Sequence, residues 1–441
     1  MAARAPRPVR ARVRMYQVGF GDCFLLTFEY RAALADGRRE RHILIDFGST
    51  HRPKAGGRLA EVAGLIEEHT GGRLDVLVVT HRHRDHLSGL GAKASGEVIE
   101  RLEPALVVRP WTEDPRAASD AEGPLGERSR RFAGALAEAQ AFAGTLAGAV
   151  AEARGARAEL GALALMQLGN QAAIDRLDRL AERAAAAYLF YGADSGIEAL
   201  VPGVRVRVLG PPTLEQWPEV AGQRAEDPEF WVAHRRLLDR ALAGTDLAGP
   251  RAEELREAAG AGEEPPPGPA RWLIDRMRGH QAASLRRVVG TLDDALNNTS
   301  VILLFEAGGR RLLFPGDAQI EAWSYALTGA PDRRALRRAL GAVDLYKVGH
   351  HGSRNATPRS LFALWGDGPP ERPMAALMST LSGVHGRTEA THVPRATLVA
   401  ALERRARLFS TDGLAPERPF IELAAPLRGE EPFSLEESAG E

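Results

Sequence analysis

Thr80-His81-Arg82-His83-Arg84-Asp85-His86 is the stretch that decides the interpretation of this chain, because it places three imidazoles and a carboxylate within six residues. It follows the apolar run 74–79, which predicts a strand that ends in a loop. Side chains alternate between the faces of a strand, so His81 and His83 can share one side and bind one cation. Asp85 and His86, where the loop turns, can reach a second. Imidazole and carboxylate ligands suit zinc, manganese or iron. The alternative interpretation of this segment is a surface loop or a phosphate-binding patch.

Three further predicted strands end in polar residues of the same kind. Residues 311–317 (RLLFPGD) end in a glycine turn and Asp317, which can bridge two metals. Residues 344–353 (DLYKVGHHGS) end in His350 and His351. Residues 43–49 (ILIDFGS) carry Asp46, which we expect beneath the metal loop, where it would orient the ligands. Each segment alone is a weak signal, but four in this order on one chain indicate a metal site.

With these segments the sequence resembles the metallo-β-lactamase fold superfamily, whose signature is His-x-His-x-Asp-His, then a distant Gly-Asp and a final His. A closer resemblance is to the hydrolase domain of the membrane DNA-uptake (competence) proteins and their free-standing relatives. It rests on residues 18–25 (VGFGDCFL), 297–304 (NNTSVILL), the Phe-Pro-Gly-Asp strand and Gly349-His350-His351-Gly352-Ser353. Residues 391–413 resemble that family's closing helix and Thr-Asp strand. The resemblance covers roughly residues 10–112, 200–213 and 295–425.

The resemblance implies two divalent metal ions, zinc first and manganese as the alternative. It assigns one ion to His81 and His83, and a second to Asp85, His86 and His351, with Asp317 between the two. We prefer His351 to His350 as the ligand because it directly precedes a glycine, as the final ligand does in many relatives. His350 would then support the ligands or face the substrate.

The chain departs from the superfamily pattern just before Ser300, where many members carry another histidine. Here the sequence is Leu296-Asn297-Asn298, and asparagine is a poor zinc ligand. We therefore expect the first metal to be held by fewer protein groups. His234 and His280 are candidates to substitute, although ordinary helix positions explain them more simply.

The implied function is metal-dependent hydrolysis by a metal-bound hydroxide, with a phosphodiesterase or nuclease as the leading interpretation. Catalytic roles would fall to Asp85, Asp317 and His350. Groups expected to orient ligands or contact the substrate, a nucleic acid or nucleotide, are Asp46, Asn297, Asn298, Lys347 and Ser353. One alternative is an esterase, lactonase or phosphocholine-ester hydrolase of the same fold. Another is a nucleotide-binding sensor or a protein that docks a partner.

Composition agrees with a soluble enzyme. The chain has 441 residues, 44% of them hydrophobic and 26% charged, and a formal net charge of −1 that gives no global basic field. The single cysteine, Cys23, excludes an intrachain disulfide and fits a reducing compartment, so a cytoplasmic location is expected. The basic N-terminus lacks the apolar segment of a secretory signal, and no run of 18 apolar residues predicts a membrane span.

Alternating strands and helices predict an α/β protein, and the resemblance implies a four-layer αββα sandwich of the metallo-β-lactamase type with a helical insertion. Residues 1–112 and 291–441 would form the two halves of this fold. Residues 113–290 would form a mostly helical insertion with one core strand near 204–209. Predicted helices within the insertion cover residues 135–151, 174–189, 229–243 and 252–259. We expect the insertion to cover one side of the metal site, or alternatively to form a contact with a partner protein or a second copy.

Overall fold

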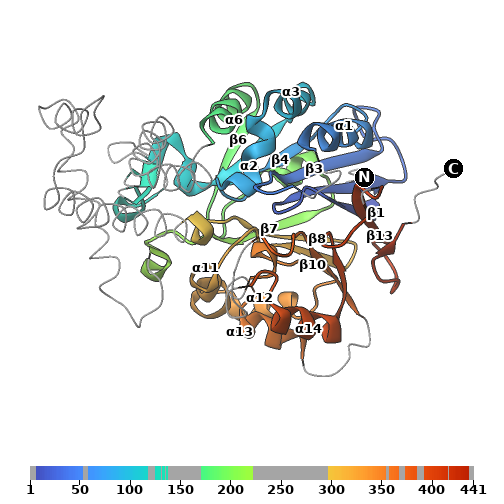
Figure 1. Cartoon of the computed structure of the whole chain (residues 1–441). Helices are drawn as coiled ribbons and strands as arrows, with labels where there is room; N and C mark the ends of the chain where they lie inside the picture. Colours follow the sequence, from blue (N-terminus) through green and yellow to red (C-terminus); the bar gives the residue numbers. More distant parts are fainter. Residues whose placement is uncertain are drawn as a thin grey trace, which may run out of the picture.

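The computed structural model describes residues 6–52, 58–117, 125–137 apart from 131 and 135, 170–221, 296–353, 357–366, 373–384, 392–415 and 417–436. This part of the chain forms two mixed β-sheets with helices around them, so the predicted α/β class is confirmed (Figure 1). No helix within these ranges combines the length and the apolar character needed to cross a membrane.

The first sheet has eight strands in the order β14-β13-β1-β2-β3-β4-β5-β6. Neighbours from β14 to β3 are antiparallel, whereas those from β3 to β6 are parallel. The apolar runs that predicted β2 and β4 are buried along almost their whole length, as expected of central strands. Its strands are β1 (Pro8–Tyr16), β2 (Cys23–Tyr30), β3 (Glu40–Phe47), β4 (Val76–Val78), β5 (Leu106–Pro110), β6 (Ala185–Leu189), β13 (Phe420–Pro426) and β14 (Ser434–Leu435).

The second sheet has six strands in the order β12-β11-β10-β9-β8-β7. The pairs from β12 to β9 are parallel, and β9, β8 and β7 are joined antiparallel. Its strands are β7 (Arg205–Gly210), β8 (Ile302–Ala307), β9 (Arg310–Phe314), β10 (Leu345–Lys347), β11 (Met374–Met378) and β12 (Ala406–Ser410).

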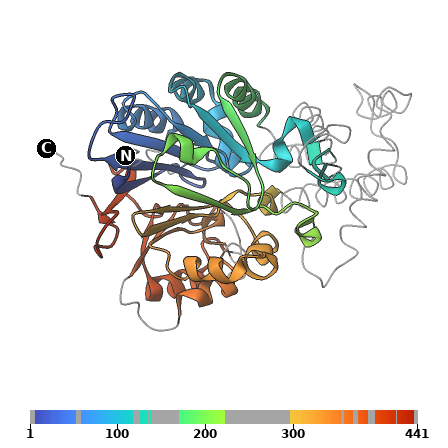
Figure 2. The same ribbon diagram turned by 180° about the vertical axis from the view of Figure 1, so that it is seen from behind.

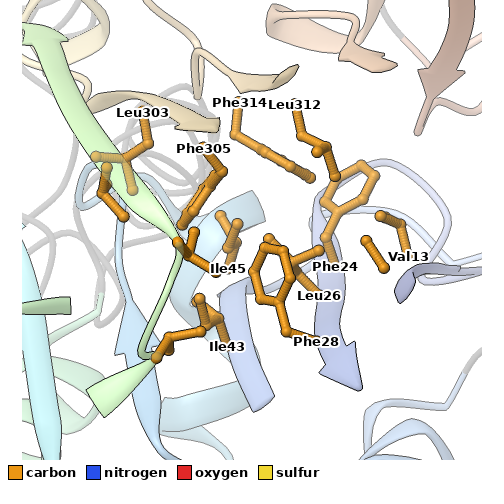
Figure 3. Packing of buried hydrophobic residues seen from close by; sticks show 14 of the residues in the cluster. Val13, Phe24, Leu26, Phe28, Ile43, Ile45, Leu303, Phe305, Leu312 and Phe314 are labelled. Carbon is orange, nitrogen blue, oxygen red and sulfur yellow. The ribbon is translucent and has the colours of Figure 1, made fainter. Parts of the chain in front are cut away.

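Apolar side chains of the two sheets meet in one shared core (Figure 3). The ring centroids of Phe24 in β2 and Phe314 in β9 are 6.0 Å apart, and those of Phe28 and Phe305 are 6.4 Å apart. Phe305 in turn contacts Phe314 edge to face, with centroids 5.9 Å apart. Burial of these large rings provides much of the hydrophobic free energy that holds the sheets together.

Helices cover the face of each sheet that points away from the shared core (Figures 1 and 2). Those beside the first sheet are α1 (Leu59–His69), α2 (Arg84–Gly91), α3 (Lys93–Arg101) and α6 (Gln171–Arg183), and their apolar residues share a core with β2–β5. Those beside the second sheet include α11 (Ile320–Ser324), α12 (Arg333–Leu340), α13 (Arg359–Phe362) and α14 (Ala396–Arg405). The short α7 (Ile197–Leu200) lies between β6 and β7 in the chain.

The structure differs from the prediction between residues 174 and 210. The predicted helix 174–189 is too long: α6 ends at Arg183, and the next residues form β6, which pairs with β5. Two strands, β6 and β7, therefore join the sheets where the sequence predicted one. The predicted helices 229–243 and 252–259, most of 135–151, and both His234 and His280 lie outside the described residues.

Candidate metal centre

The candidate site lies where four strands end. β3 and β4 run parallel in the first sheet, as do β9 and β10 in the second, so the residues after each pair leave their sheet at a common edge. Asp46 is near the end of β3 and residues 79–86 follow β4. Asp317 follows β9, whereas His350 and His351 follow β10. The topology thus gathers the four predicted segments.

Four side chains converge there, two from each half of the chain. One ligand atom each from Asp85, His86, Asp317 and His351 lies within 4.8 Å of the others. His86 Nε2 is 3.1 Å from Asp317 Oδ2, and His351 Nε2 is 3.0 Å from Asp85 Oδ2. His86 Nε2 is buried and faces the Asp317 carboxylate, as expected of a nitrogen that would share a cation with that carboxylate. Two imidazoles and two carboxylates are a donor set that fits zinc or manganese.

The sequence predicted that Asp85 and His86 lie in a loop. The structure instead places both in the first turn of α2. The helix N-terminus favours the negative charge of Asp85. Close packing brings this turn against the first sheet: a Cβ on Gly48 would lie 2.5 Å from Leu87 N and 2.6 Å from Arg84 O. Only glycine at position 48 therefore leaves room for the turn that carries two of the four ligands.

His81 and His83 form a second pair of facing nitrogens. His81 Nε2 is 3.0 Å from His83 Nδ1, a separation that two ligands of one zinc ion can have, since zinc–nitrogen bonds are about 2.0–2.1 Å. Burial and the neighbouring His86 and His83 hold the pKa of His81 well below its ordinary value, which favours the neutral form that binds metals. Among the described residues, no third histidine, cysteine or carboxylate joins this pair as closely as in the four-residue cluster.

Asp46 orients both groups of histidines. Its Oδ2 accepts hydrogen bonds from His86 Nδ1 at 2.8 Å and from Thr80 Oγ1 at 2.7 Å, and its Oδ1 accepts one from Thr80 N at 2.7 Å. Because the Thr80 hydroxyl donates to a carboxylate, it accepts from His81 Nδ1 at 3.1 Å. Both His86 and His81 are thereby held in the tautomer that leaves Nε2 free to bind a metal.

The structure brings His351, rather than His350, into the cluster. His351 Nδ1 donates to the carbonyl oxygen of Ser379 at 3.0 Å, which leaves Nε2 directed toward Asp85. His350 contributes its backbone N–H, which donates to Asp317 Oδ1 at 3.0 Å, and its side chain is half-buried.

Strained backbone is concentrated at this site. Four non-glycine residues in the described chain have positive φ, and three of them are Asp46 (57°), His350 (40°) and His351 (53°). The left-handed region is costly for side chains with a Cβ, and such residues persist where the surroundings hold them for a function.

Asp22 is a site residue that the sequence analysis did not single out. It is fully buried, directly precedes β2, and forms an ion pair with Lys347. Its Oδ1 is also 3.5 Å from His351 Nδ1. The only sequence signal was its position after a glycine at the start of an apolar strand, within a segment used for the family resemblance.

Lys347 is 2% exposed, and three oxygens accept from its ammonium group. Besides Asp22, these are Gly316 O at 3.0 Å and Asp317 Oδ1 at 3.2 Å. An ammonium has three N–H donors, so none remains for a substrate. Of the two roles expected for Lys347, the geometry is that of a residue which supports ligands.

The remaining predicted residues lie close by. Asn297 and Asn298 are buried in the turn before β8, where Ser300 Oγ accepts from Asp317 N at 3.2 Å. Within the described chain, neither asparagine Oδ1 has a hydrogen-bond partner, and the same holds for the buried Ser353 Oγ. Asparagine is a poor zinc ligand, so these two residues do not replace the histidine that the superfamily pattern places here. In the part of the chain that the structure describes, the first metal position therefore still has only His81 and His83 as candidate nitrogen ligands.

The charges at the site are strongly coupled. Burial lowers the pKa of His86, but the carboxylates of Asp317, Asp46 and Asp85 outweigh it and raise this pKa well above its ordinary value. Burial likewise opposes, and Asp317 and Asp22 produce, a raised pKa at His351. Burial raises the pKa values of Asp85 and Asp317, but the positive charge of His86 outweighs it and lowers both. Without a metal, the imidazoles of His86 and His351 therefore hold protons where a cation would otherwise lie.

No family model matches the chain, and no curated protein matches it either.

Proposed function

We propose that this protein is a metal-dependent hydrolase of the metallo-β-lactamase type, with an αββα arrangement and a phosphodiester substrate. The observation that supports it best is the convergence of Asp85, His86, Asp317 and His351 from three distant segments within 4.8 Å. The family assignment rests on the motifs 81–86, 315–317 and 349–353. It is supported by the positions of their strands, β4 in the first sheet and β9 and β10 in the second, whose ends lie together at the site.

The balance of charge supports bound cations. Four buried or half-buried carboxylates, those of Asp22, Asp46, Asp85 and Asp317, are paired in the described chain with Lys347 and with the imidazoles of His86 and His351, which give up their positive charge when they ligate a metal. Burying that many carboxylates without compensating charge is costly. Divalent cations would supply this compensation while leaving the imidazoles neutral, so we infer that they are part of the working site.

Bound divalent ions supply a Lewis acid and lower the pKa of a bound water. Within the protein, Asp85, His86 and His351 would hold one ion and Asp317 would bind between the two positions. His81 and His83 would hold the other ion, which has fewer protein ligands. Zinc is the first choice and manganese the second, since nitrogen and oxygen donors are mixed. His350, half-buried beside Asp317, is the residue placed to give a proton to a leaving group.

The test is zinc and manganese content of the purified chain, together with hydrolysis of bis(p-nitrophenyl) phosphate. Asp317→Asn and His351→Asn keep the size of the side chain while removing a ligand, and both should lose metal and turnover. The matched controls are Asp75→Asn and His392→Asn. Asp75 is buried outside the four-residue cluster and accepts a hydrogen bond of 2.8 Å from His42 N, and His392 is exposed. Absence of metal from the wild type, or full turnover in Asp317→Asn, would refute the proposal.

Hydrolysis of a carboxylic ester, lactone, thioester or phosphocholine ester is the rival within the same chemistry. Running p-nitrophenyl acetate and p-nitrophenyl phosphocholine beside the diester decides between them. The proposal requires that kcat/KM is largest for bis(p-nitrophenyl) phosphate and that this activity is lost in Asp317→Asn.

A nucleotide-binding sensor is the second candidate, and Asn297 and Asn298 in place of a histidine favour it. A sensor would bind a labelled nucleotide in a metal-dependent manner while all test substrates stay intact. Partner docking through residues 113–290 remains a prediction. We also propose the cytoplasm as the location, on the ground that the single cysteine, Cys23, is a buried free thiol.

A further inference from the structure

The two oxygens of Asp317 face different groups. Oδ1 accepts from Lys347 Nζ at 3.2 Å and from the backbone N–H of His350 at 3.0 Å. Oδ2 lies 3.1 Å from His86 Nε2 and 3.5 Å from His351 Nε2. One oxygen is thus bonded to protein donors, while the other faces the nitrogens that would bind a metal.

Lys347 is itself held in place by the first half of the chain. Its ammonium forms an ion pair with Asp22, which precedes β2 in the first sheet, whereas Lys347 ends β10 in the second. All three N–H donors have acceptors, and both residues are almost completely buried. A side chain so constrained can fix the rotation of the carboxylate that it contacts.

We propose that Lys347, held by Asp22, is a positioning residue that fixes Asp317 so that it binds metal through Oδ2 alone. This inference rests on the proposed function, because it concerns the same site. It narrows the role of Asp317, because Oδ1 is occupied by protein donors and only Oδ2 would be available to metal ions. It also assigns a role to Asp22, which holds Lys347 and lies 3.5 Å from His351 Nδ1.

Charge and orientation must be separated in the test. Replacing Lys347 alone removes a positive charge, which strengthens attraction for a cation, and at the same time frees Asp317 to rotate, which weakens binding. The double variant Asp22→Asn/Lys347→Met removes one negative and one positive charge, so the formal charge of the site is unchanged. Any change in its metal affinity therefore reports the orientation of the ligands that Asp22 and Lys347 contact, Asp317 and His351, rather than the formal charge of the site.

The experiment measures zinc affinity by competition with a chromogenic chelator, and stability by thermal unfolding of the metal-free proteins. Losing a group that orients a ligand typically weakens metal affinity about 10- to 100-fold, and we expect this in the double variant. We also expect the double variant to be more stable than Lys347→Met, which leaves Asp22 buried and unpaired. A purely structural ion pair predicts instead that the double variant recovers both stability and zinc affinity, and that result would overturn the proposal.

A crystal structure of the zinc-loaded wild type tests the same inference without any variant. Asp317 Oδ2 should be within bonding distance of zinc, with Oδ1 still on Lys347 Nζ; zinc bonded to Oδ1 would overturn the inference. Failure of the proposed function is distinguishable, because the wild type would then bind no zinc or hydrolyse nothing. Wild-type turnover combined with wild-type zinc affinity in the double variant refutes only the role of Lys347.

Discussion

Asp46 Oδ2 accepts a hydrogen bond from His86 Nδ1 at 2.8 Å, so this carboxylate fixes which nitrogen of His86 is available to a metal. In Asp46→Asn, an amide N–H₂ at that position would donate to Nδ1 and move the imidazole proton to Nε2. We expect zinc affinity to fall about 10- to 100-fold, as measured by chelator competition. Asparagine tolerates the positive φ at this position, so the backbone should stay in place.

Asp75→Asn is the matched control for that experiment. Asp75 is also buried and also accepts a backbone N–H, that of His42. Its loss should lower the free energy of unfolding by about 1–3 kcal/mol and leave zinc affinity unchanged. Equal losses of zinc affinity in both variants would contradict the role assigned to Asp46.

His350 and His351 form a natural pair for comparison, because both are histidines with positive φ in one turn. Asparagine suits this backbone, so His351→Asn and His350→Asn should both fold. We expect His351→Asn to lose metal from the cluster. His350→Asn should keep its metal, since the backbone N–H that donates to Asp317 is retained. As the proposed proton donor, His350 should matter most for a phosphodiester with an alkoxide leaving group, whose turnover we expect to fall about 10²- to 10⁴-fold in this variant. Metal loss in both variants would argue against this division of roles.

Zinc binding should release protons and tighten as pH rises. Burial opposes, but nearby carboxylates produce, raised pKa values of His86 and His351 in the metal-free protein, so both imidazoles must lose a proton before they ligate. The affinity should therefore rise with pH up to the raised pKa values, including the range above the ordinary histidine pKa, where an unperturbed imidazole would already be neutral. Calorimetric titration in buffers of different ionisation enthalpy measures the number of protons released. An affinity that is constant from pH 6.5 to 8.5 would contradict the expectation.

His42 should make stability depend on pH well away from the metal site. Burial, with Arg38 and Arg14 nearby, lowers its pKa from 6.5 to about 3. Between these values the unfolded chain binds a proton that the folded chain does not, so His42 makes stability fall as pH falls from 6.5 toward 3. Thermal unfolding of metal-free protein from pH 7 to 4 should show a weaker pH dependence in His42→Gln than in the wild type. An identical slope in both would refute the assignment.

Gly48→Ala should disturb the metal site through packing alone. The added Cβ would lie 2.5 Å from Leu87 N, so the first turn of α2 must move and carry Asp85 and His86 with it. We expect reduced stability together with reduced zinc affinity. Gly64→Ala is the control, since that glycine lies within α1 with open space around its Cβ position. It should stabilise the protein by about 0.5–1 kcal/mol without affecting zinc. A neutral effect of Gly48→Ala would show that the turn can adjust.

Much of the candidate site could be predicted from the sequence because its residues follow strands, and strand ends gather at sheet edges. His81, His83, Asp85 and His86 are contiguous, and Asp317 and His351 follow obvious apolar runs. Asp22 could not be found in this way, because its meaning depends on a contact with Lys347, which lies more than 300 residues away in the sequence. Nothing local distinguishes a buried ion-pair aspartate from one in a turn.

The limits for the fold have a similar physical origin. β6 has the sequence Ala-Ala-Ala-Tyr-Leu, and alanine favours helix over strand. Pairing with β5 outweighs this local preference, since the edge of the parallel sheet supplies hydrogen bonds that an isolated segment lacks. The pairing of β1 with β13 is also invisible locally, because it joins opposite ends of the chain.

That last pairing affects how the protein is made. β13 lies against β1 from Tyr16↔Phe420 to Arg10↔Pro426, so the sheet begun by the first strands is completed only by residues near the end. A ribosome synthesises the first half long before β13 emerges, and until then β1 presents an open edge to which other chains can add. Yield in cells should therefore depend on chaperones that shield this edge, and expression of the N-terminal half alone should give aggregates.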